Sequence, residues 1–316
     1  MKHFVIFNPG ARDGRGKKKI TKIIKLLRKN NIDFEYKITK TFDDAYKFSK
    51  EAIQKFYDVI IAVGGDGTIN QVINGFFDDD GKKISSSLFG VIYTGTSPDF
   101  CKNYNIPIKI EKAISIIKNK KHKPIKIGKI KFMKNCNDTI CITRYFTCCA
   151  NIGIGASLAQ NANSGIRKIF GDFFGTFISL IKVLFVYRAN NFEILIDNKK
   201  KTIKKLYNLS IGKTFHIASG IKIRNELEKN EKDFYLLTIK NLNLLRTVNV
   251  IKRIYSGKKI EGNKSISLSY CNKIEIMKND INPQIEFDGD PAGYLPCVIQ
   301  KADNHLDVIC NQKGKI

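Results

Sequence analysis

The segment from Val63 to Asn70 has the residue types of a phosphate-binding turn. It reads Val-Gly-Gly-Asp-Gly-Thr-Ile-Asn, and its glycines leave backbone N–H groups unshielded by side chains. A helix that starts here would add the attraction of its positive end for a phosphate group. Asp66 would repel a bare phosphate, so its presence indicates a Mg²⁺ ion between the two. Thr68 is suited either to donate a hydroxyl hydrogen bond or to cap the helix.

A second group of acids stands near the end of the chain, in Asp288-Gly289-Asp290-Pro291. Paired carboxylates in a turn bind a cation, or one of them acts as a general base. Asp-Gly is also a strong hairpin signal, and taken alone the pattern favours an ordinary turn. Together with a phosphate loop it gains a second meaning, because phosphoryl transfer needs a base for the attacking hydroxyl group.

The elements around the first segment predict a parallel sheet. The apolar run Val59–Ala62 reads as a buried strand, and a helical pattern follows the glycines. Strands expected at 4–7, 32–38, 59–62 and 88–92 alternate with helices around 20–27, 45–56, 72–77 and 113–117. Such βα units form parallel sheets that bind ligands beyond the carboxyl ends of their strands. Asn8-Pro9, Gly64 to Thr68 and Gly95 to Asp99 all follow such ends, so we expect them to form one site.

After Lys121 the pattern becomes rich in strands, which predicts antiparallel pairing. The expected strands are 125–132, 140–150, 192–196, 206–212, 236–239, 266–268, 274–277 and 285–287. A helical insert is expected at about 156–189. Its apolar part, Phe173 to Tyr187, is shorter than the ~20 residues of a membrane span and contains Lys182, so we expect no transmembrane segment. The chain therefore reads as an α/β nucleotide-binding domain, 1–122, followed by a mainly β domain, 123–295.

The charge of the chain is unusual, because 55 basic and 29 acidic residues give a formal net charge of +26 over 316 residues. Nucleotide phosphates and an anionic membrane are the partners that we expect for such a surface. Lys is spread along the chain rather than clustered, which also fits a general enrichment of Lys on solvated faces. For the same reason we do not expect nucleic-acid binding.

The eight cysteines include no Cys-x-x-Cys pair, so neither a zinc site nor a disulfide framework is indicated. A reducing cytoplasm fits this usage. The chain opens directly into an expected strand, and this opening is too short for a signal peptide.

Three further motifs give the chain its resemblance to a known family. Asn8-Pro9-Gly10-Ala11, Gly95-Thr96-Ser97-Pro98-Asp99-Phe100 and Asp288-Gly289-Asp290 accompany the glycine-rich loop in order along the chain. With them the chain resembles the bacterial diacylglycerol kinases and the sphingosine-kinase-like lipid kinases. The loop itself is shared with the NAD kinases, so it marks a superfamily rather than one activity.

The resemblance implies a fold, a site and an activity. The fold is an NAD kinase- and diacylglycerol kinase-like α/β domain followed by a β-sandwich, with residues from about 296 to 316 packed back on the first domain and the active site in the cleft between the domains. ATP and Mg²⁺ are the implied cofactors. The implied nucleotide contacts are Asn8, Pro9, Gly10, Ala11, Arg12, Thr39, Gly64, Gly65, Asp66, Gly67, Thr68, Ile69, Asn70 and Thr96.

The resemblance also assigns the carboxylates. Asp66 holds Mg²⁺ through waters, Asp290 is the catalytic base, and Asp288 places Mg²⁺ or orients the base. Asp99 lies on the substrate side. Glu231, in Asn230-Glu231-Lys232-Asp233, matches an Asp-Asp-Gly turn that holds a structural Mg²⁺ in some members, and here a lysine stands beside it.

Two further departures from the family pattern concern the site. Asp290 stands where the family has Glu, and Pro98 replaces an Asn. A shorter carboxylate at 290 sits one methylene further back, and a misplacement of ~1 Å can cost about 100-fold in rate.

The function that we predict is ATP- and Mg²⁺-dependent phosphorylation of the hydroxyl of diacylglycerol or a related lipid alcohol, as part of phospholipid metabolism, by an enzyme that is cytoplasmic and peripheral at the inner membrane surface. A soluble metabolite kinase of the NAD kinase type is one alternative. A nucleotide- or lipid-binding protein with weakened catalysis is another. The choice of lipid and the oligomeric state stay open, with a homodimer among the alternatives.

Overall fold

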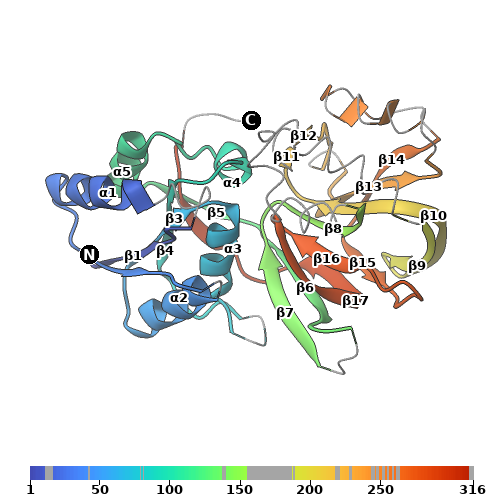
Figure 1. Cartoon of the computed structure of the whole chain (residues 1–316), viewed down its shortest axis with the longest axis horizontal. Helices are drawn as coiled ribbons and strands as arrows, with labels where there is room; N and C mark the ends of the chain where they lie inside the picture. Colours follow the sequence, from blue (N-terminus) through green and yellow to red (C-terminus); the bar gives the residue numbers. More distant parts are fainter. Residues whose placement is uncertain are drawn as a thin grey trace. The chain divides into compact units, whose positions relative to one another are not determined.

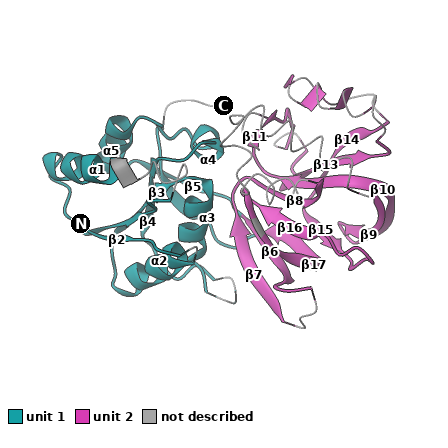
Figure 2. Cartoon of the chain, in the orientation of Figure 1, with its two compact units in different colours: residues 1–127, 302–316 teal, residues 128–301 magenta. Residues whose placement is uncertain are grey.

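The computed structural model describes residues 1–10, 17–41, 43–78, 80, 82–136, 140–154, 187, 189–217, 221–227, 230–242, 246, 249–250, 253–254, 256–257, 260 and 264–312. The chain divides into two compact units (Figure 2). The first comprises Met1–Ile127 and Ala302–Ile316, and the second comprises Gly128–Lys301. Ala11, Arg12 and nearly all of the expected helical insert at 156–189 lie outside the described residues.

The first unit is built on a sheet with the strand order β2-β1-β3-β4-β18-β5 (Figure 1). Its strands are β1 (His3–Phe7), β2 (Phe34–Ile38), β3 (Val59–Gly64), β4 (Leu88–Tyr93), β5 (His122–Ile125) and β18 (Leu306–Ile309). Its helices are α1 (Lys17–Lys29), α2 (Asp44–Gln54), α3 (Asp66–Asn74), α4 (Asp99–Asn103) and α5 (Ile110–Asn119). All neighbours pair in parallel except β5, which runs antiparallel to β18 at the edge.

Burial explains this arrangement. Every residue of β1 and of β3 is buried, as expected for central strands of a sheet that helices cover on both faces. The apolar stripes of α1 and α5 pack in one core with alternate residues of the central strands, such as Val5 and Ile61. The helices α2 and α3 contact each other and pack on β1 and β3. The carboxyl ends of β1, β3 and β4 consequently carry their three turns along the same edge.

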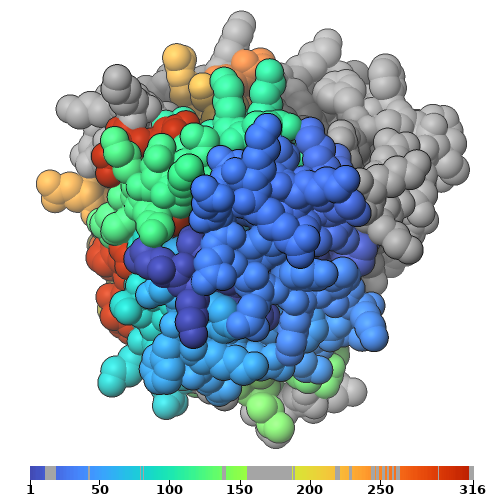
Figure 3. Space-filling view, turned by 90° about the vertical axis from the view of Figure 1, so that its left-hand side faces the viewer, coloured from blue at the N-terminus to red at the C-terminus, as the bar shows by residue number. Residues whose placement is uncertain are grey.

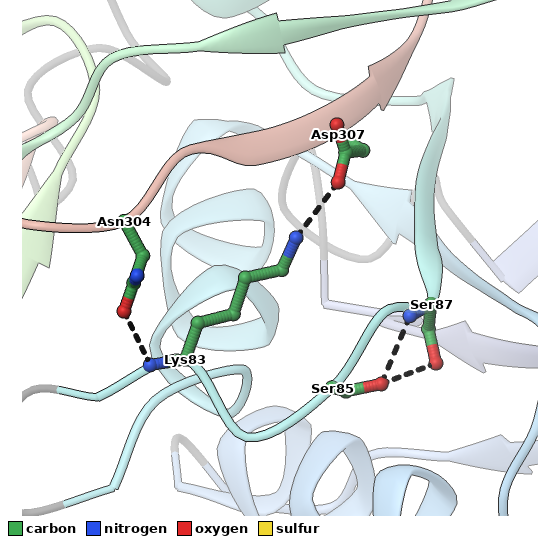
Figure 4. Close-up of polar contacts among 5 residues, drawn as sticks. All are labelled: Lys83, Ser85, Ser87, Asn304 and Asp307. Carbon is green, nitrogen blue, oxygen red and sulfur yellow. Dashed lines mark hydrogen bonds and ion pairs between the residues drawn. The ribbon is translucent and has the colours of Figure 1, made fainter.

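The end of the chain completes this sheet. Lys83 Nζ forms an ion pair with Asp307 of β18 at 2.8 Å, and the Lys83 N–H donates to Asn304 Oδ1 at 3.0 Å (Figure 4). On the face of the first unit drawn in Figure 3, the red surface of the C-terminal segment lies between green and cyan surface of earlier residues. The last strand therefore belongs to the first unit.

The second unit is an antiparallel sheet of the strand order β14-β13-β10-β8-β16-β17-β15-β9, with β6 and β7 attached through β17. These strands are β6 (Gly128–Met133), β7 (Cys141–Phe146), β8 (Cys149–Gly153), β9 (Asn190–Ile196), β10 (Lys199–Gly212), β13 (Phe234–Lys240), β14 (Ile266–Cys271), β15 (Lys273–Ile276), β16 (Gln284–Phe287) and β17 (Asp290–Lys301). The short pair β11 (His216–Ile217) and β12 (Ile221–Lys222) forms its own ladder. Because β9 pairs with both β15 and β10, part of the sheet closes on itself around an apolar core.

The expected fold class, a parallel-sheet α/β domain followed by an all-β domain, is confirmed. The strands differ in detail, because the expected strand 125–132 is two strands. Ile125 pairs with Leu306 in the first sheet, whereas Gly128 pairs with Lys301 in the second. The first unit therefore takes in residues 123–127. Since β17 runs unbroken to Lys301, the return to the first unit begins at Ala302 rather than near 296. Within the described residues, no helix is long and apolar enough to cross a membrane.

Candidate active site

Asn8, the first polar residue beyond β1, ties two of the expected loops together. Its Nδ2 donates to the Thr68 hydroxyl oxygen at 2.8 Å, and its Oδ1 accepts from the Gly10 N–H at 2.9 Å. The Asn8 N–H donates to the Val63 carbonyl at the end of β3. The start of α3 has no side-chain cap, so Thr68 does not cap the helix. Its hydroxyl oxygen accepts from Asn8, and a hydroxyl that accepts in this way can also donate.

The glycine-rich loop is as tight as its sequence predicts. A Cβ atom on Gly64 would lie 2.3 Å from the Thr68 hydroxyl oxygen, and one on Gly95 would lie 2.5 Å from the Gly65 Cα. The β3–α3 and β4–α4 turns therefore approach each other backbone to backbone. With Gly65 at the N-cap, the first-turn N–H groups of α3 are not covered by a capping side chain. The loop has the form of an anion site.

Asp66 and Asp99, expected on the metal and substrate sides, lie next to each other. The Asp99 N–H donates to Asp66 Oδ2 at 3.3 Å, and the Asp99 side chain is buried. The pKa of Tyr93 is raised by burial and then by the charge of Asp66, and the pKa of Cys101 is raised by the same two causes. Neither Tyr93 nor Cys101 was among the sequence candidates. Their signal was only their position beside the Gly95 to Phe100 motif.

The proline in this motif has a structural explanation. Pro98 is the N-cap of α4, and its carbonyl accepts from the Lys102 N–H at 2.9 Å. A helix start leaves backbone N–H groups without intrahelical partners, so the N–H that proline lacks is not needed there.

The remaining nucleotide-side candidates differ in what they offer. Thr39 is buried at the end of β2 and donates its N–H to Phe7. The Ile69 side chain is in the core and its N–H donates to Gly65, while Asn70 is buried and accepts from the Asn74 amide. Thr96 is exposed in the loop beyond β4. Thr96 is thus the accessible side chain of this group.

In the second unit, the terminal acids form the tip of the β16–β17 hairpin. Phe287 pairs with Asp290, and the two residues between them have positive φ angles, +50° for Asp288 and +98° for Gly289. This is the geometry of a type I′ turn, which Asp-Gly favours. The hairpin reading and the site reading of this sequence are therefore compatible.

Asp288 is engaged by the backbone of a neighbouring turn. Its Oδ2 accepts from the Thr147 N–H at 2.7 Å and from the Thr147 hydroxyl at 2.9 Å. Its Oδ1 accepts from the N–H groups of Cys148 and Cys149, at 2.8 and 3.2 Å. A carboxylate with both oxygens bound in this way anchors the hairpin tip to the β7–β8 turn.

Asp290 has a different environment. Its Oδ2 is buried and finds no hydrogen-bond partner among the described residues. Burial, and then the charge of Asp288, raises the pKa of Asp290 to about 6. A carboxyl group that titrates near neutrality is suited to accept and release a proton.

Glu286 is the acid that sequence reasoning left without a role. It is 4% exposed, and burial raises its pKa to about 8. Its Oε2 accepts from Asn151 at 2.6 Å, and its Oε1 accepts from the Gly289 N–H. The available signal was the spacing of acids at 286, 288 and 290, which puts Glu286 in the same hairpin as Asp288 and Asp290.

Glu231 lies in an exposed turn at φ +51°. Beside it, Lys232 Nζ pairs with Asp197 at 2.9 Å, and Asp197 also accepts the N–H groups of Asn272 and Lys273. The Lys232 ammonium group thus places a positive charge at the turn where the resemblance implies a structural Mg²⁺.

The residues present fit a Mg²⁺ ion on the nucleotide side. The Asp66 carboxylate lies against the backbone at the start of α4, where it accepts from the Asp99 N–H, and carboxylate oxygens are ligands of this ion. Over the described part of the chain, no group of three or more His, Cys, Asp and Glu residues is arranged to hold a metal. Mg²⁺ is commonly bound through one or two carboxylates together with the phosphates of the substrate.

The sequence comparisons show which proteins the chain resembles. Residues 2–130 match the family model described as the diacylglycerol kinase catalytic domain. The resemblance to the diacylglycerol kinases is confirmed. A relative named diacylglycerol kinase from Bacillus subtilis is 26% identical over 306 residues, which cover 96% of this chain and 95% of that protein. One from Staphylococcus haemolyticus is 26% identical over 319 residues, which cover 98% and 88%.

The comparison of solved structures supports the fold. A diacylglycerol kinase structure from Bacillus anthracis has a TM-score of 0.67 and 21% identity, and the match covers 98% of this chain and 97% of that one. A yeast NADH kinase structure has a TM-score of 0.53 and 10% identity, with 99% and 84% covered. The two-unit architecture is therefore common to the diacylglycerol kinase and NADH kinase structures.

Proposed function

We propose that this protein is an ATP- and Mg²⁺-dependent lipid kinase that phosphorylates the hydroxyl of diacylglycerol or a related lipid alcohol. The observation that carries the proposal is the pairing of two features in one chain. One is a glycine-lined helix start with Asp66 in its first turn, and the other is a hairpin tip with a buried carboxyl group, Asp290. Relatives named diacylglycerol kinase, which match along nearly the whole chain, support the choice of acceptor.

In this proposal each group has a stated task. The first turn of α3 and the Thr68 hydroxyl bind the ATP phosphates. Asp66, with Asp99, holds Mg²⁺, whose charge offsets that of the phosphates. Asp290 accepts the proton of the lipid hydroxyl as its oxygen forms a bond to the γ-phosphorus, and the bond from that phosphorus to ADP breaks. Asp288 holds the hairpin tip through Thr147, Cys148 and Cys149.

The basic surface suits a substrate that lies in an anionic membrane. Each Lys or Arg near such a surface contributes about 1 kcal/mol of attraction, so a few on one face suffice for peripheral binding. We propose that the protein works at an anionic membrane surface. We expect the protein to sediment with vesicles that contain anionic lipid and not with neutral vesicles. High salt should abolish this sedimentation.

The test is transfer of labelled phosphate from ATP to a panel of lipid alcohols in anionic vesicles. We expect label on diacylglycerol or a related lipid, no label with Asp290→Ala, and normal labelling with Asp280→Ala. Asp280 is an exposed acid of the same unit, so it is the matched control. Transfer to a soluble dinucleotide instead of lipid would show a metabolite kinase. ATP binding without transfer to any acceptor would contradict kinase activity.

A further inference from the structure

Glu286, to which the proposed function gives no task, belongs to a row of polar side chains across three strands. In the strand register Glu286 of β16 lies opposite Asn151 of β8, and Asn151 lies opposite Ser210 of β10. Asn151 Nδ2 donates to Glu286 Oε2 at 2.6 Å, and the Ser210 hydroxyl donates to Asn151 Oδ1. Asn208 Nδ2 extends the row by donating to the Ser210 oxygen at 2.9 Å. The row therefore runs from the body of the sheet to the hairpin.

The free end of this row reaches the hairpin tip itself. Glu286 Oε1 accepts from the N–H of Gly289, the second central residue of the turn. Asp288, the first central residue, is held from the other side by Thr147, Cys148 and Cys149. Gly289 is thus held by the carboxyl group of Glu286, and Asp288 is held through its own carboxyl group. The next residue along the chain is Asp290.

A plain hairpin does not need this arrangement. Asp-Gly already favours the turn, so the local sequence forms the tip without help from Glu286. Burying a carboxyl group costs free energy unless hydrogen bonds compensate, and Glu286 is buried with both oxygens bonded. A buried carboxyl group with hydrogen bonds on both oxygens, beside a turn that the local sequence already favours, points to a requirement for precision at the tip.

We propose that Glu286 is the positioning residue of the terminal turn: it fixes the direction of the Asp290 carboxyl group through the Gly289 N–H and joins the tip to the sheet through Asn151 and Ser210. This rests on the proposed function, in which Asp290 is the base. A base must be held close to its productive geometry, since a displacement of ~1 Å can cost about 100-fold in rate.

The experiment compares Glu286→Gln with Glu286→Met in the full chain, with Glu275→Gln as the matched control. Gln keeps an oxygen that accepts from Gly289, whereas Met has a similar length and no acceptor. Glu275 lies on β15 and pairs with Lys273, outside the row. We expect kcat for lipid phosphorylation to fall about 100-fold in E286M and less than about 10-fold in E286Q, with ATP affinity unchanged in both. E275Q should match the wild type.

Hydrogen exchange of the peptide that contains Gly289 gives a second readout that does not require activity. We expect faster exchange in E286M, and wild-type exchange in E286Q and E275Q. Wild-type kcat in folded E286M, or unchanged exchange at Gly289, would overturn the positioning role. If Glu286→Met does not fold, E286Q decides the test. Normal exchange at Gly289 with kcat within about 10-fold of the wild type supports the proposal. A loss of kcat equal to that of Asp290→Ala overturns it. Failure of the proposed function is distinct, because the wild type itself would then phosphorylate no lipid while the exchange result still reports on the turn.

Discussion

Asn8 and Thr68, which are 60 positions apart in the chain, are joined by a hydrogen bond of 2.8 Å from the Asn8 amide to the Thr68 hydroxyl oxygen. This contact links the loop beyond β1 to the first turn of α3. Accepting from Asn8 uses one lone pair of the Thr68 oxygen, and the hydroxyl remains a potential donor. The two loops that carry Asn8 and Thr68 are therefore held together by a side-chain contact.

The Asn8 contact gives a prediction for nucleotide binding. Asn8→Ala removes the hydrogen bond to Thr68 and the contact with the Gly10 N–H, and we expect the Kd for ATP to rise about tenfold. Titration with a fluorescent ATP analogue measures this. Asn30→Ala is the control, because Asn30 also forms a side-chain hydrogen bond, to Leu26 in α1. An unchanged Kd in Asn8→Ala would contradict the role of this contact.

The position of Asp66 gives a prediction for metal dependence. Asp66→Asn keeps the shape of the side chain and removes the charge that would hold Mg²⁺. We expect wild-type protein to bind ATP more tightly with Mg²⁺ than with EDTA. The ratio of the Kd in EDTA to the Kd in Mg²⁺ should fall to about 1 in the variant. Calorimetric titration under both conditions measures it.

Asp44→Asn is the matched control, since Asp44 is the acid in the first turn of α2. Its carboxylate accepts from Lys40 and Thr41, so its loss should lower stability slightly and leave the effect of Mg²⁺ on ATP affinity intact. Equal loss of the ratio in both variants would remove the case for Asp66 as the metal residue.

The raised pKa of Asp290 gives a prediction for pH dependence. A base must be ionised, and burial raises the pKa of this carboxyl group to about 6. We expect kcat to be at its plateau above pH 7 and to fall about tenfold per pH unit below the pKa, as Asp290 takes up a proton. A kcat profile between pH 5 and pH 8 measures this. A plateau that extends down to pH 5 would exclude Asp290 as the titrating base.

The ion pair beside Glu231 gives a prediction for stability. The side chains of Lys232 and Asp197 are each about one-third exposed. The Asp197 carboxylate binds the Lys232 ammonium group and also accepts two backbone N–H groups. We expect Lys232→Ala to lower the free energy of unfolding by about 1 kcal/mol, and less at high salt. Lys200→Ala is the control, since its pair with Glu193 is more exposed. Denaturant unfolding measures both.

Thermal unfolding with and without added Mg²⁺ tests Glu231 as a metal ligand. If Glu231 holds a structural Mg²⁺, added Mg²⁺ raises the unfolding temperature of the wild type and not that of Glu231→Ala. If the lysine ammonium supplies the charge alone, Mg²⁺ shifts neither. A Mg²⁺ effect that disappears in Glu231→Ala would restore the metal assignment.

The sequence by itself determined the local parts of this protein. The strand Val59–Gly64, the glycine turn and α3 follow from a buried run, glycines and helical spacing, and the Asp288-Gly289 hairpin follows from its turn residues. The change from alternating βα units to strands determined the fold class. These signals suffice because periodicity and turn preferences act between residues that are close in the chain.

Only the tertiary structure decided which polar groups meet. Asp288 binds the backbone of Thr147 to Cys149, and Glu286 binds Asn151, because β16 lies beside β8 in one particular register. Likewise Ile125 and Gly128 join different sheets, although one apolar pattern covers both. Hydrogen-bond partners are set by the register of strands that are distant in the chain, and a shift of one residue would turn each side chain to the other face. The acids were therefore visible in the sequence, while the fold decided that Asp288 is anchored by its neighbours and that Asp290 has a buried Oδ2.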